Sequence, residues 1–125
     1  MRGVVFDTGA LIALDRGDRA VLVLVAEARL ANAPITVPAA CVAQAWRAPS
    51  RQVRLGKFLR LPNVQIVALD DGDARLVGML LARSRSRDVV DAHVALCGHR
   101  RGQVVLTSDP TGLRALVPQL AVQRV

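Results

Sequence analysis

The sequence predicts an α/β fold: a single domain with a central, mainly parallel sheet of about four to five strands and helices on both faces. Short apolar runs rich in β-favouring residues alternate with longer segments whose apolar residues recur at helical spacing, which is typical of a parallel sheet. The chain has 125 residues, enough for one domain over residues 1–125. Hydrophobic residues make up 52%, with one Trp, two Phe and no Tyr, so the core must be aliphatic.

The N-terminal half predicts two strands and four helices. Its first strand is apolar at every position, as in a strand buried on both faces of a parallel sheet. Pro38 suits the first turn of a helix, and Pro49 breaks that helix. In order, we expect a strand at 3–6, a short helix at 10–14, a helix from about 19 to 31, a strand at 35–37, a helix from 39 to about 47 and a helix that ends at 60.

The C-terminal half predicts three strands and three helices. Asp70 or Asp71 is expected to cap an amphipathic helix in which Leu76, Met79 and Leu80 recur at helical spacing. In order, we expect a strand at 65–69, this amphipathic helix, a helix from 88 to about 99, a strand at 103–106, a short helix at 113–116 and a strand at 121–123.

The chain carries a net charge of +7, almost wholly from arginine, since Lys57 is its only lysine. A basic surface suggests a polyanionic partner, and the planar guanidinium group can bind phosphate oxygens through two hydrogen bonds. Arginine used only for solubility is the alternative that composition leaves open.

Cys41 and Cys97 form no redox or zinc motif, which indicates buried free thiols in a reducing compartment. The charged residue Asp7 comes too early for the apolar region of a signal peptide, and no apolar run is long enough to span a bilayer. We therefore expect a soluble, cytoplasmic protein without membrane association.

Four aspartates are expected to meet at one edge of the sheet. Asp7 follows the first strand and Asp109 follows the fourth, where ligands bind in such sheets. Asp88 and Asp91 begin the crossover helix, roughly 60° apart around its axis. Carboxylates gathered in this way raise one another's pKa values, and a hard divalent cation such as Mg²⁺ or Mn²⁺ removes that penalty. A bound metal can activate water and stabilise charge on a phosphoryl group.

A simpler interpretation remains open. Asp7, Asp88 and Asp109 each precede a helix and could be ordinary N-caps, and Asp88 with Asp91 resembles a capping box. Asp91 lies one turn inside its helix, where no cap is needed. We therefore expect Asp91 to be a metal ligand, and Asp88 to be a cap that also adds charge.

Basic residues recur at helical spacing from residue 47 to residue 60. Such a stripe can follow a phosphate backbone, although a charged run is usually a solvated helix face. With one Trp and no Tyr there is no evident platform for base stacking, so we expect backbone contacts to dominate. His93 and His99 are expected to lie outside the metal site. The stripe consists of Arg47, Arg51, Arg54, Lys57 and Arg60, and we expect Arg47, Arg51 and Arg54, with Thr8 and Ser108, to contact substrate.

Three short motifs, in order and at appropriate spacing, resemble those of the PIN-domain ribonucleases and, within them, the VapC-type toxins of bacterial toxin–antitoxin pairs. Residues 5–11 (VFDTGAL) resemble that family's opening aspartate motif, residues 88–92 (DVVDA) its central motif and residues 107–110 (TSDP) its last motif. The resemblance covers essentially the whole chain and implies a single PIN-like domain. It matches Asp91 to the family's metal-binding aspartate.

The resemblance implies a Mg²⁺- or Mn²⁺-dependent endoribonuclease that prefers single-stranded RNA. Asp7, Asp91, Asp109 and Asp88 would be catalytic, and the first three of these would bind the metal. The resemblance also implies a homodimer, inhibited by a small antitoxin that places an arginine in the acidic site. Where the family usually has a glutamate, this chain has Gln44, a weaker oxygen ligand with one negative charge fewer. Glu27, the only glutamate, lies on a different helix. A degenerate module that binds RNA or a protein without cutting is therefore the alternative function.

Two further enzyme classes fit poorly. Residues 7–10 (DTGA) also match the aspartic-protease motif, but that chemistry needs two such aspartates on an all-β frame. A haloacid-dehalogenase site would need a second aspartate where this chain has Gly9.

Overall fold

The computed structural model describes residues 1–125 and contains one five-stranded sheet in the order β3-β2-β1-β4-β5. Every neighbouring pair of strands is parallel, which confirms the predicted fold class. None of the helices has the length and apolarity needed to cross a membrane. The strands are β1 (Val4–Phe6), β2 (Ile35–Pro38), β3 (Val64–Val67), β4 (Val104–Thr107) and β5 (Val122–Arg124). The helices are α1 (Thr8–Asp15), α2 (Arg19–Leu30), α3 (Ala39–Ala45), η1 (Pro49–Arg51, a 3₁₀ turn), α4 (Val53–Leu59), α5 (Asp71–Ser84), α6 (Val89–Arg101) and α7 (Pro110–Leu116).

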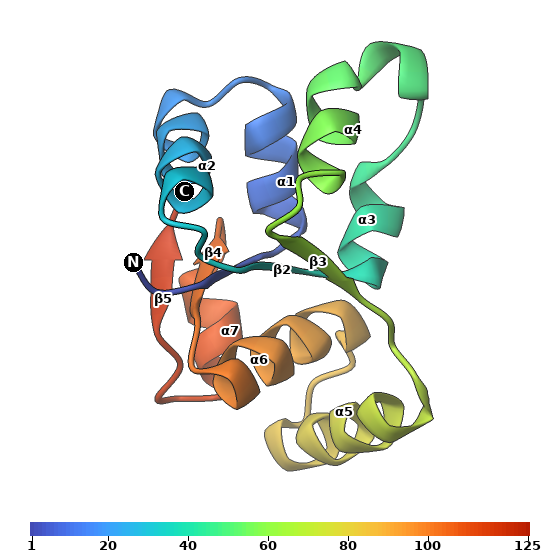
Figure 1. The fold of residues 1–125 in the computed structure, drawn as a ribbon. Coiled ribbons are helices and arrows are strands. Elements are labelled where there is room, and N and C mark those ends of the chain that lie inside the picture. The colour runs from blue at the N-terminus through green and yellow to red at the C-terminus, as the bar shows by residue number, and fades with distance from the viewer.

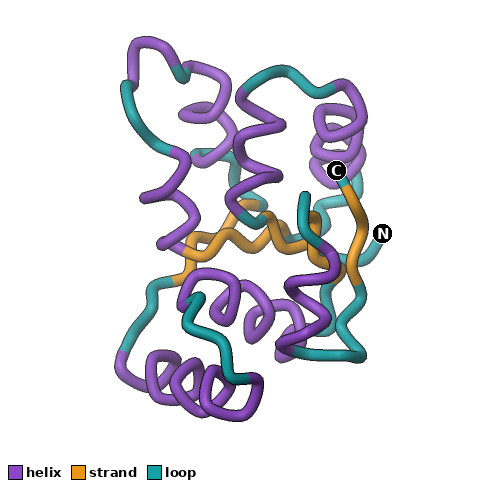
Figure 2. Tube along the Cα trace, turned by 180° about the vertical axis from the view of Figure 1, so that it is seen from behind, coloured by secondary structure: helices purple, strands orange, loops and turns teal.

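Helices cover both faces of the sheet, as predicted. In Figure 1, α1, α2, α3 and α4 lie above the strands, and α5, α6 and α7 lie below them. The view from behind in Figure 2 shows the strands as one layer between these two groups of helices. Helix α6 packs directly on β1, β2 and β4, whereas α5 packs mainly on α6. The sheet is therefore buried at its centre.

The core is aliphatic, as the composition requires. Val5, Phe6, Ile35 and Leu106 on the central strands are completely buried. The one aromatic pair joins Phe6 to Phe58 of α4, with ring centroids 4.9 Å apart, a separation at which offset rings attract each other. This pair fixes α4 against the strand that leads to Asp7.

Two elements are shorter than the sequence predicts. The third strand ends at Val67 instead of residue 69 because its only partner, β2, ends at Pro38, which lies opposite Val67. The helix after β2 ends at Ala45 instead of about 47, since Trp46 has extended backbone angles ahead of Pro49. The remaining elements are confirmed within a few residues of their predicted ends.

Candidate active site

The register of the two central strands brings distant aspartates to one edge of the sheet. Phe6 of β1 lies opposite Leu106 of β4, so that Asp7 and Thr107 leave the sheet side by side. The backbone N–H of Asp7 donates to the carbonyl of Leu106 at 3.2 Å. The hydroxyl of Thr107 in turn accepts from the backbone N–H of Asp109 at 2.9 Å. Thr107, which the sequence analysis did not single out, therefore links the two aspartates.

Three of the four aspartates are N-caps, as the simpler interpretation predicts. The Oδ1 atom of Asp7 accepts from the backbone N–H of Ala10 at 2.8 Å at the start of α1. Asp88 caps α6 in the same way, through the backbone N–H of Asp91 at 2.9 Å. Asp109 caps α7 through Gly112 at 3.1 Å. Each cap uses Oδ1, so the second carboxylate oxygen takes no part in capping.

Asp91 is in a different electrostatic position. It lies in the first turn of α6, not one turn inside the helix as predicted, and its side chain caps nothing. Burial, and after it the negative charges of Asp88, Asp7 and Asp109, raise its pKa to about 6. Burial also raises the pKa of Asp7, against hydrogen bonds from Thr107 and backbone N–H groups that lower it. The neighbouring carboxylates are therefore close enough to disfavour charge on Asp91 and Asp7.

The donor chemistry fits a hard divalent cation. The side chains are carboxylates with a shared excess of negative charge, and Mg²⁺ and Mn²⁺ prefer such oxygen donors together with water. No three His, Cys, Asp or Glu side chains lie close enough together to form a complete metal site as the structure stands. The fit is therefore one of donor type and charge, with water left to complete the coordination.

Thr8 and Gln44 lie together beside Asp7. The Thr8 hydroxyl donates to Oε1 of Gln44 at 2.5 Å, joining the first turn of α1 to the last turn of α3. Ser108 lies against Gly9, where a Cβ atom would overlap its hydroxyl and come within 3.4 Å of Oδ1 of Asp7. Only a glycine at position 9 leaves this contact undisturbed.

A cavity of about 560 Å³ begins at Gly9 and Ser108 and extends along α1 to Arg16.

The basic residues do not form one stripe. Only Arg54 and Lys57 share a helix, α4, while Arg47 and Arg51 precede it. The Arg47 guanidinium donates to the carbonyls of Ala43 and Trp46, and that of Arg54 donates to the carbonyl of Asp15. The 3₁₀ turn that begins at Pro49 separates Arg47 from α4, in agreement with the helix break predicted at Pro49, so the helical spacing of these residues does not correspond to one helix face.

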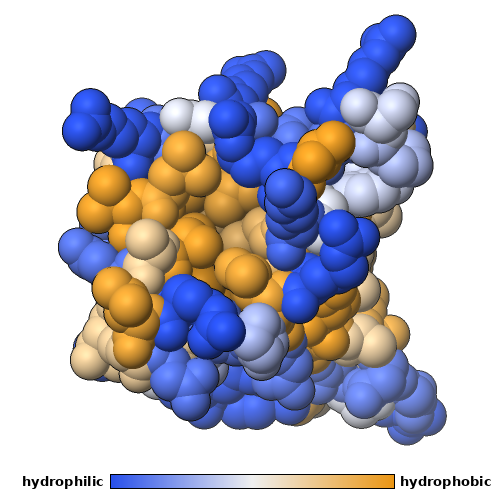
Figure 3. Space-filling model, turned by 45° about the horizontal axis from the view of Figure 1, so that its top comes forward, coloured by the Kyte–Doolittle hydropathy of each residue, from blue (hydrophilic) through white to orange (hydrophobic).

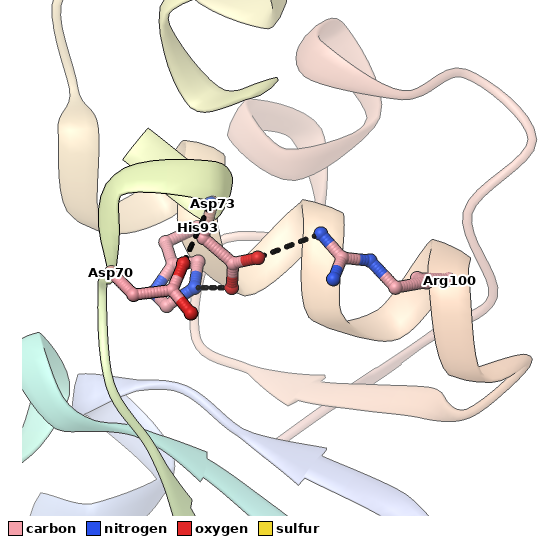
Figure 4. Close-up of polar contacts among 4 residues, drawn as sticks. All are labelled: Asp70, Asp73, His93 and Arg100. Carbon is pink, nitrogen blue, oxygen red and sulfur yellow. Dashed lines mark hydrogen bonds and ion pairs between the residues drawn. The ribbon is translucent and has the colours of Figure 1, made fainter. Parts of the chain in front are cut away.

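A buried polar network lies outside this site, between α5 and α6. His93 of α6 is completely buried, and its Nε2 lies 2.8 Å from Oδ2 of Asp73 on α5. Arg100 donates to the other oxygen of Asp73 at 2.9 Å (Figure 4). The hydrogen bond with His93 lowers the pKa of Asp73 below its ordinary value, and Arg100 lowers it as well. The network holds α5 on α6 and confirms that His93 lies outside the carboxylate site.

This network was missed at the sequence level, although a signal for it exists. Asp73, Val77 and Leu80 are spaced as one helix face, and all three are buried. An acidic residue on an apolar stripe of this kind needs a buried partner.

Both cysteines are buried free thiols, as predicted. Burial raises the pKa of Cys41 to about 12.

Comparison with known proteins gives one family and a set of related folds. The model of the PIN domain family matches residues 4–115. No curated protein matches the sequence. A structure of FitAB bound to the IR36 DNA fragment shares 16% identity and a TM-score of 0.68, covering 97% of this chain and 94% of that one. VapBC2 from Rickettsia felis, bound to a DNA fragment from its promoter, shares 13% identity and a TM-score of 0.71, covering 98% of both chains. FitAcB from Neisseria gonorrhoeae shares 17% identity and a TM-score of 0.66, covering 95% of both.

Proposed function

This chain belongs to the PIN domain family, and we propose that it is a divalent-metal-dependent endoribonuclease that acts as the toxin of a toxin–antitoxin pair. The observation that carries the proposal is the group of aspartates at the carboxyl edge of the sheet, in which Asp7, Asp88 and Asp109 all raise the pKa of Asp91. Mutual repulsion of this kind opposes folding unless the group serves a cation. PIN domains are generally nucleases, which agrees with that chemistry.

Asp7, Asp91 and Asp109 would hold Mg²⁺ or Mn²⁺, and Asp88 would add negative charge while it caps α6. When bound, such an ion supplies an activated water and stabilises the charge that develops on a phosphoryl group. The caps keep the carboxylates of Asp7 and Asp109 oriented, because their Oδ1 atoms are fixed by helix N–H groups. We leave Gln44 out of the ligand set, since its Oε1 already accepts the Thr8 hydroxyl proton.

RNA is the substrate that best fits the charge and the composition. The net charge of +7 attracts a phosphate backbone, and a chain with no Tyr offers little surface for base stacking. Thr8 and Ser108 flank the carboxylates and would contact the phosphodiester, and Arg51 and Arg54 would bind neighbouring phosphates. We propose that the RNA is single-stranded, as the resemblance to the PIN-domain toxins implies. We propose a cytoplasmic location, where such a substrate is found.

A degenerate, non-cutting module is the second candidate function. It is favoured by the neutral Gln44 beside Asp7 and by the lack of three donors already close enough to hold an ion. Such a module would bind RNA or a protein through the same edge without cleaving it.

A small antitoxin and a second copy of this chain are the proposed protein partners. Support comes from the VapBC and FitAB assemblies whose folds this chain shares, and from exposed apolar side chains on α2 and α4. Figure 3 shows apolar residues gathered on the face over the helices at the top of Figure 1, with hydrophilic side chains around them. The most exposed of these apolar residues on α2 and α4 are Val23 (48%), Leu30 (90%) and Val53 (58%). An antitoxin arginine could enter the acidic edge from this face.

RNA cleavage by the purified protein tests the proposed activity. We expect Mn²⁺ or Mg²⁺ to support cleavage of single-stranded RNA, and EDTA to abolish it. Asp91→Asn should lower the rate by at least about a hundredfold because the most strained ligand is lost. Asp71→Asn is the matched control, since Asp71 is exposed and pairs only with Arg75. Metal-dependent cleavage absent from a broad RNA panel, or retained in Asp91→Asn, refutes the enzymatic proposal.

A further inference from the structure

The acidic edge of the sheet is rich in hydrogen-bond acceptors and poor in donors. Asp7, Asp88, Asp91 and Asp109 offer only carboxylate oxygens when they are ionised. A phosphodiester also carries only acceptor oxygens and a negative charge. Any side chain that binds the phosphate at this edge must therefore be a hydrogen-bond donor. Each such donor, neutral or cationic, contributes strongly to phosphate affinity, because its hydrogen bond is made to a charged group.

Two arginines of the predicted basic stripe, Arg47 and Arg54, are partly committed to the protein itself. Arg47 donates through Nη1 to the carbonyls of Ala43 and Trp46, which end α3. Arg54 donates to the carbonyl of Asp15, which ends α1. Both guanidinium groups thus stabilise the carboxyl ends of helices, where cations are favoured. These contacts hold part of each guanidinium group within the protein.

Gln44 is the uncharged donor beside the carboxylates. It is exposed, on the last turn of α3, and its Oε1 accepts from the hydroxyl of Thr8, the residue after Asp7. No protein group accepts from its Nε2, which keeps both hydrogens available. An amide whose oxygen is already hydrogen-bonded is a stronger N–H donor, because hydrogen bonds in a chain polarise one another.

We propose that Gln44 is a phosphate-binding residue, which donates its amide N–H to a phosphate oxygen of single-stranded RNA and does not ligate the metal. The Thr8 hydroxyl orients the amide so that its oxygen faces α1 and its NH₂ group faces the incoming strand. A glutamate at this position could keep the contact with Thr8, but it would repel the phosphate. The inference takes its ligand, RNA, from the proposed function, although it concerns binding and not cleavage.

RNA binding in EDTA separates this role from metal ligation. Affinity for a fluorescein-labelled single-stranded RNA is measured by fluorescence anisotropy, so that no cleavage interferes. Mn²⁺ affinity is measured separately by titration calorimetry without RNA. Gln44→Met keeps the length of the side chain and removes the donor, whereas Gln44→Glu keeps an oxygen for Thr8 and adds a charge. Gln119→Met is the matched control, because Gln119 is exposed and precedes β5 at the opposite edge of the sheet.

We expect Gln44→Met to weaken RNA binding about tenfold and to leave Mn²⁺ affinity unchanged. Gln44→Glu should weaken RNA binding further and strengthen Mn²⁺ binding several-fold, since it adds a carboxylate. Gln119→Met should change neither quantity. Circular dichroism and thermal melting check that every variant is folded.

Three outcomes would overturn the inference. The first is weaker Mn²⁺ binding by Gln44→Met with unchanged RNA affinity, which would make Gln44 a metal ligand. The second is an unchanged affinity for both RNA and Mn²⁺ in Gln44→Met. The third is a wild-type protein that does not bind RNA in EDTA. The proposed function is judged separately, because wild-type protein that binds RNA through Gln44 and never cleaves it with Mn²⁺ supports the non-cutting module.

Discussion

Replacing Asp91 by asparagine should stabilise the metal-free protein near neutral pH. The pKa of Asp91 rises from its ordinary 3.8 to about 6 in the folded chain, mainly through burial and then through Asp88, Asp7 and Asp109. A carboxyl group whose pKa is raised by folding holds its proton more tightly in the folded state. Stability therefore falls as the pH rises from about 4 to about 6, and stays lower above that range. Asparagine at this position removes the ionisation and its cost.

The size of the effect follows from the pKa. A rise from 3.8 to about 6 corresponds to about 3 kcal/mol, at 1.36 kcal/mol for each pH unit. Asp91 is only partly buried, so screening by water reduces this to about 1.5 kcal/mol. The lost charge in the first turn of α6 costs about 0.5 kcal/mol through the helix dipole. The net gain is about 1 kcal/mol, or about 4 °C in Tm for a domain of this size.

Thermal melting in EDTA at pH 7.5 and pH 4 measures this difference. Asp91→Asn should melt about 4 °C above wild type at pH 7.5 and should show no such gain at pH 4, where wild-type Asp91 is protonated. Asp71→Asn, at an exposed carboxylate paired with Arg75, should change Tm by little at either pH. Saturating Mn²⁺ should raise the Tm of wild type and not that of Asp91→Asn. A gain of equal size at both pH values, or a loss at pH 7.5, would refute the electrostatic reasoning.

Three further predictions concern packing and burial. Asp73→Ala should lower the free energy of unfolding by about 2–3 kcal/mol in urea titrations, because it leaves the buried ring of His93 unpaired; an effect below about 0.5 kcal/mol would contradict a structural role. Gly9→Ala should destabilise the protein by about 1 kcal/mol through its overlap with Ser108, and a double-mutant cycle with Ser108→Ala should show coupling; strictly additive effects would argue against that contact. Cys41 and Cys97 should not react with a thiol reagent at pH 8 until urea is added, since both are buried and burial raises both pKa values; rapid labelling of the folded chain would disprove this.

Sequence patterns were sufficient for the fold because they report local structure. The fully apolar run at residues 4–6 identifies a strand buried on both faces, and helical spacing identifies the long helices. Errors occur where a distant partner sets a boundary. Val67 ends β3 only because Pro38 ends β2, and no property of residues 68 and 69 reveals this.

The sequence places the aspartates along the chain but does not give the contacts between their side chains and those of their neighbours. Strand order and parallel direction place Asp7 and Asp109 at one edge, which the alternation of strands and helices already implies. The contact between Thr8 and Gln44 depends on how α3 packs beside α1, across 36 residues of sequence. The pairing of Asp73 with His93 depends on the packing of α5 on α6, so that no local pattern identifies the partner.

Capping and metal binding, which compete as explanations of the sequence, are compatible in the structure. A cap occupies one oxygen of Asp7, Asp88 or Asp109 and leaves the other free. The helix N-terminus also favours negative charge on the capping carboxylate, which offsets part of the repulsion within the group. Asp91 also lies near the N-terminus of α6, but its side chain makes no capping hydrogen bond, and burial together with the neighbouring carboxylates raises its pKa to about 6. The electrostatic strain of the group is therefore concentrated on Asp91, where a bound cation would relieve most of it.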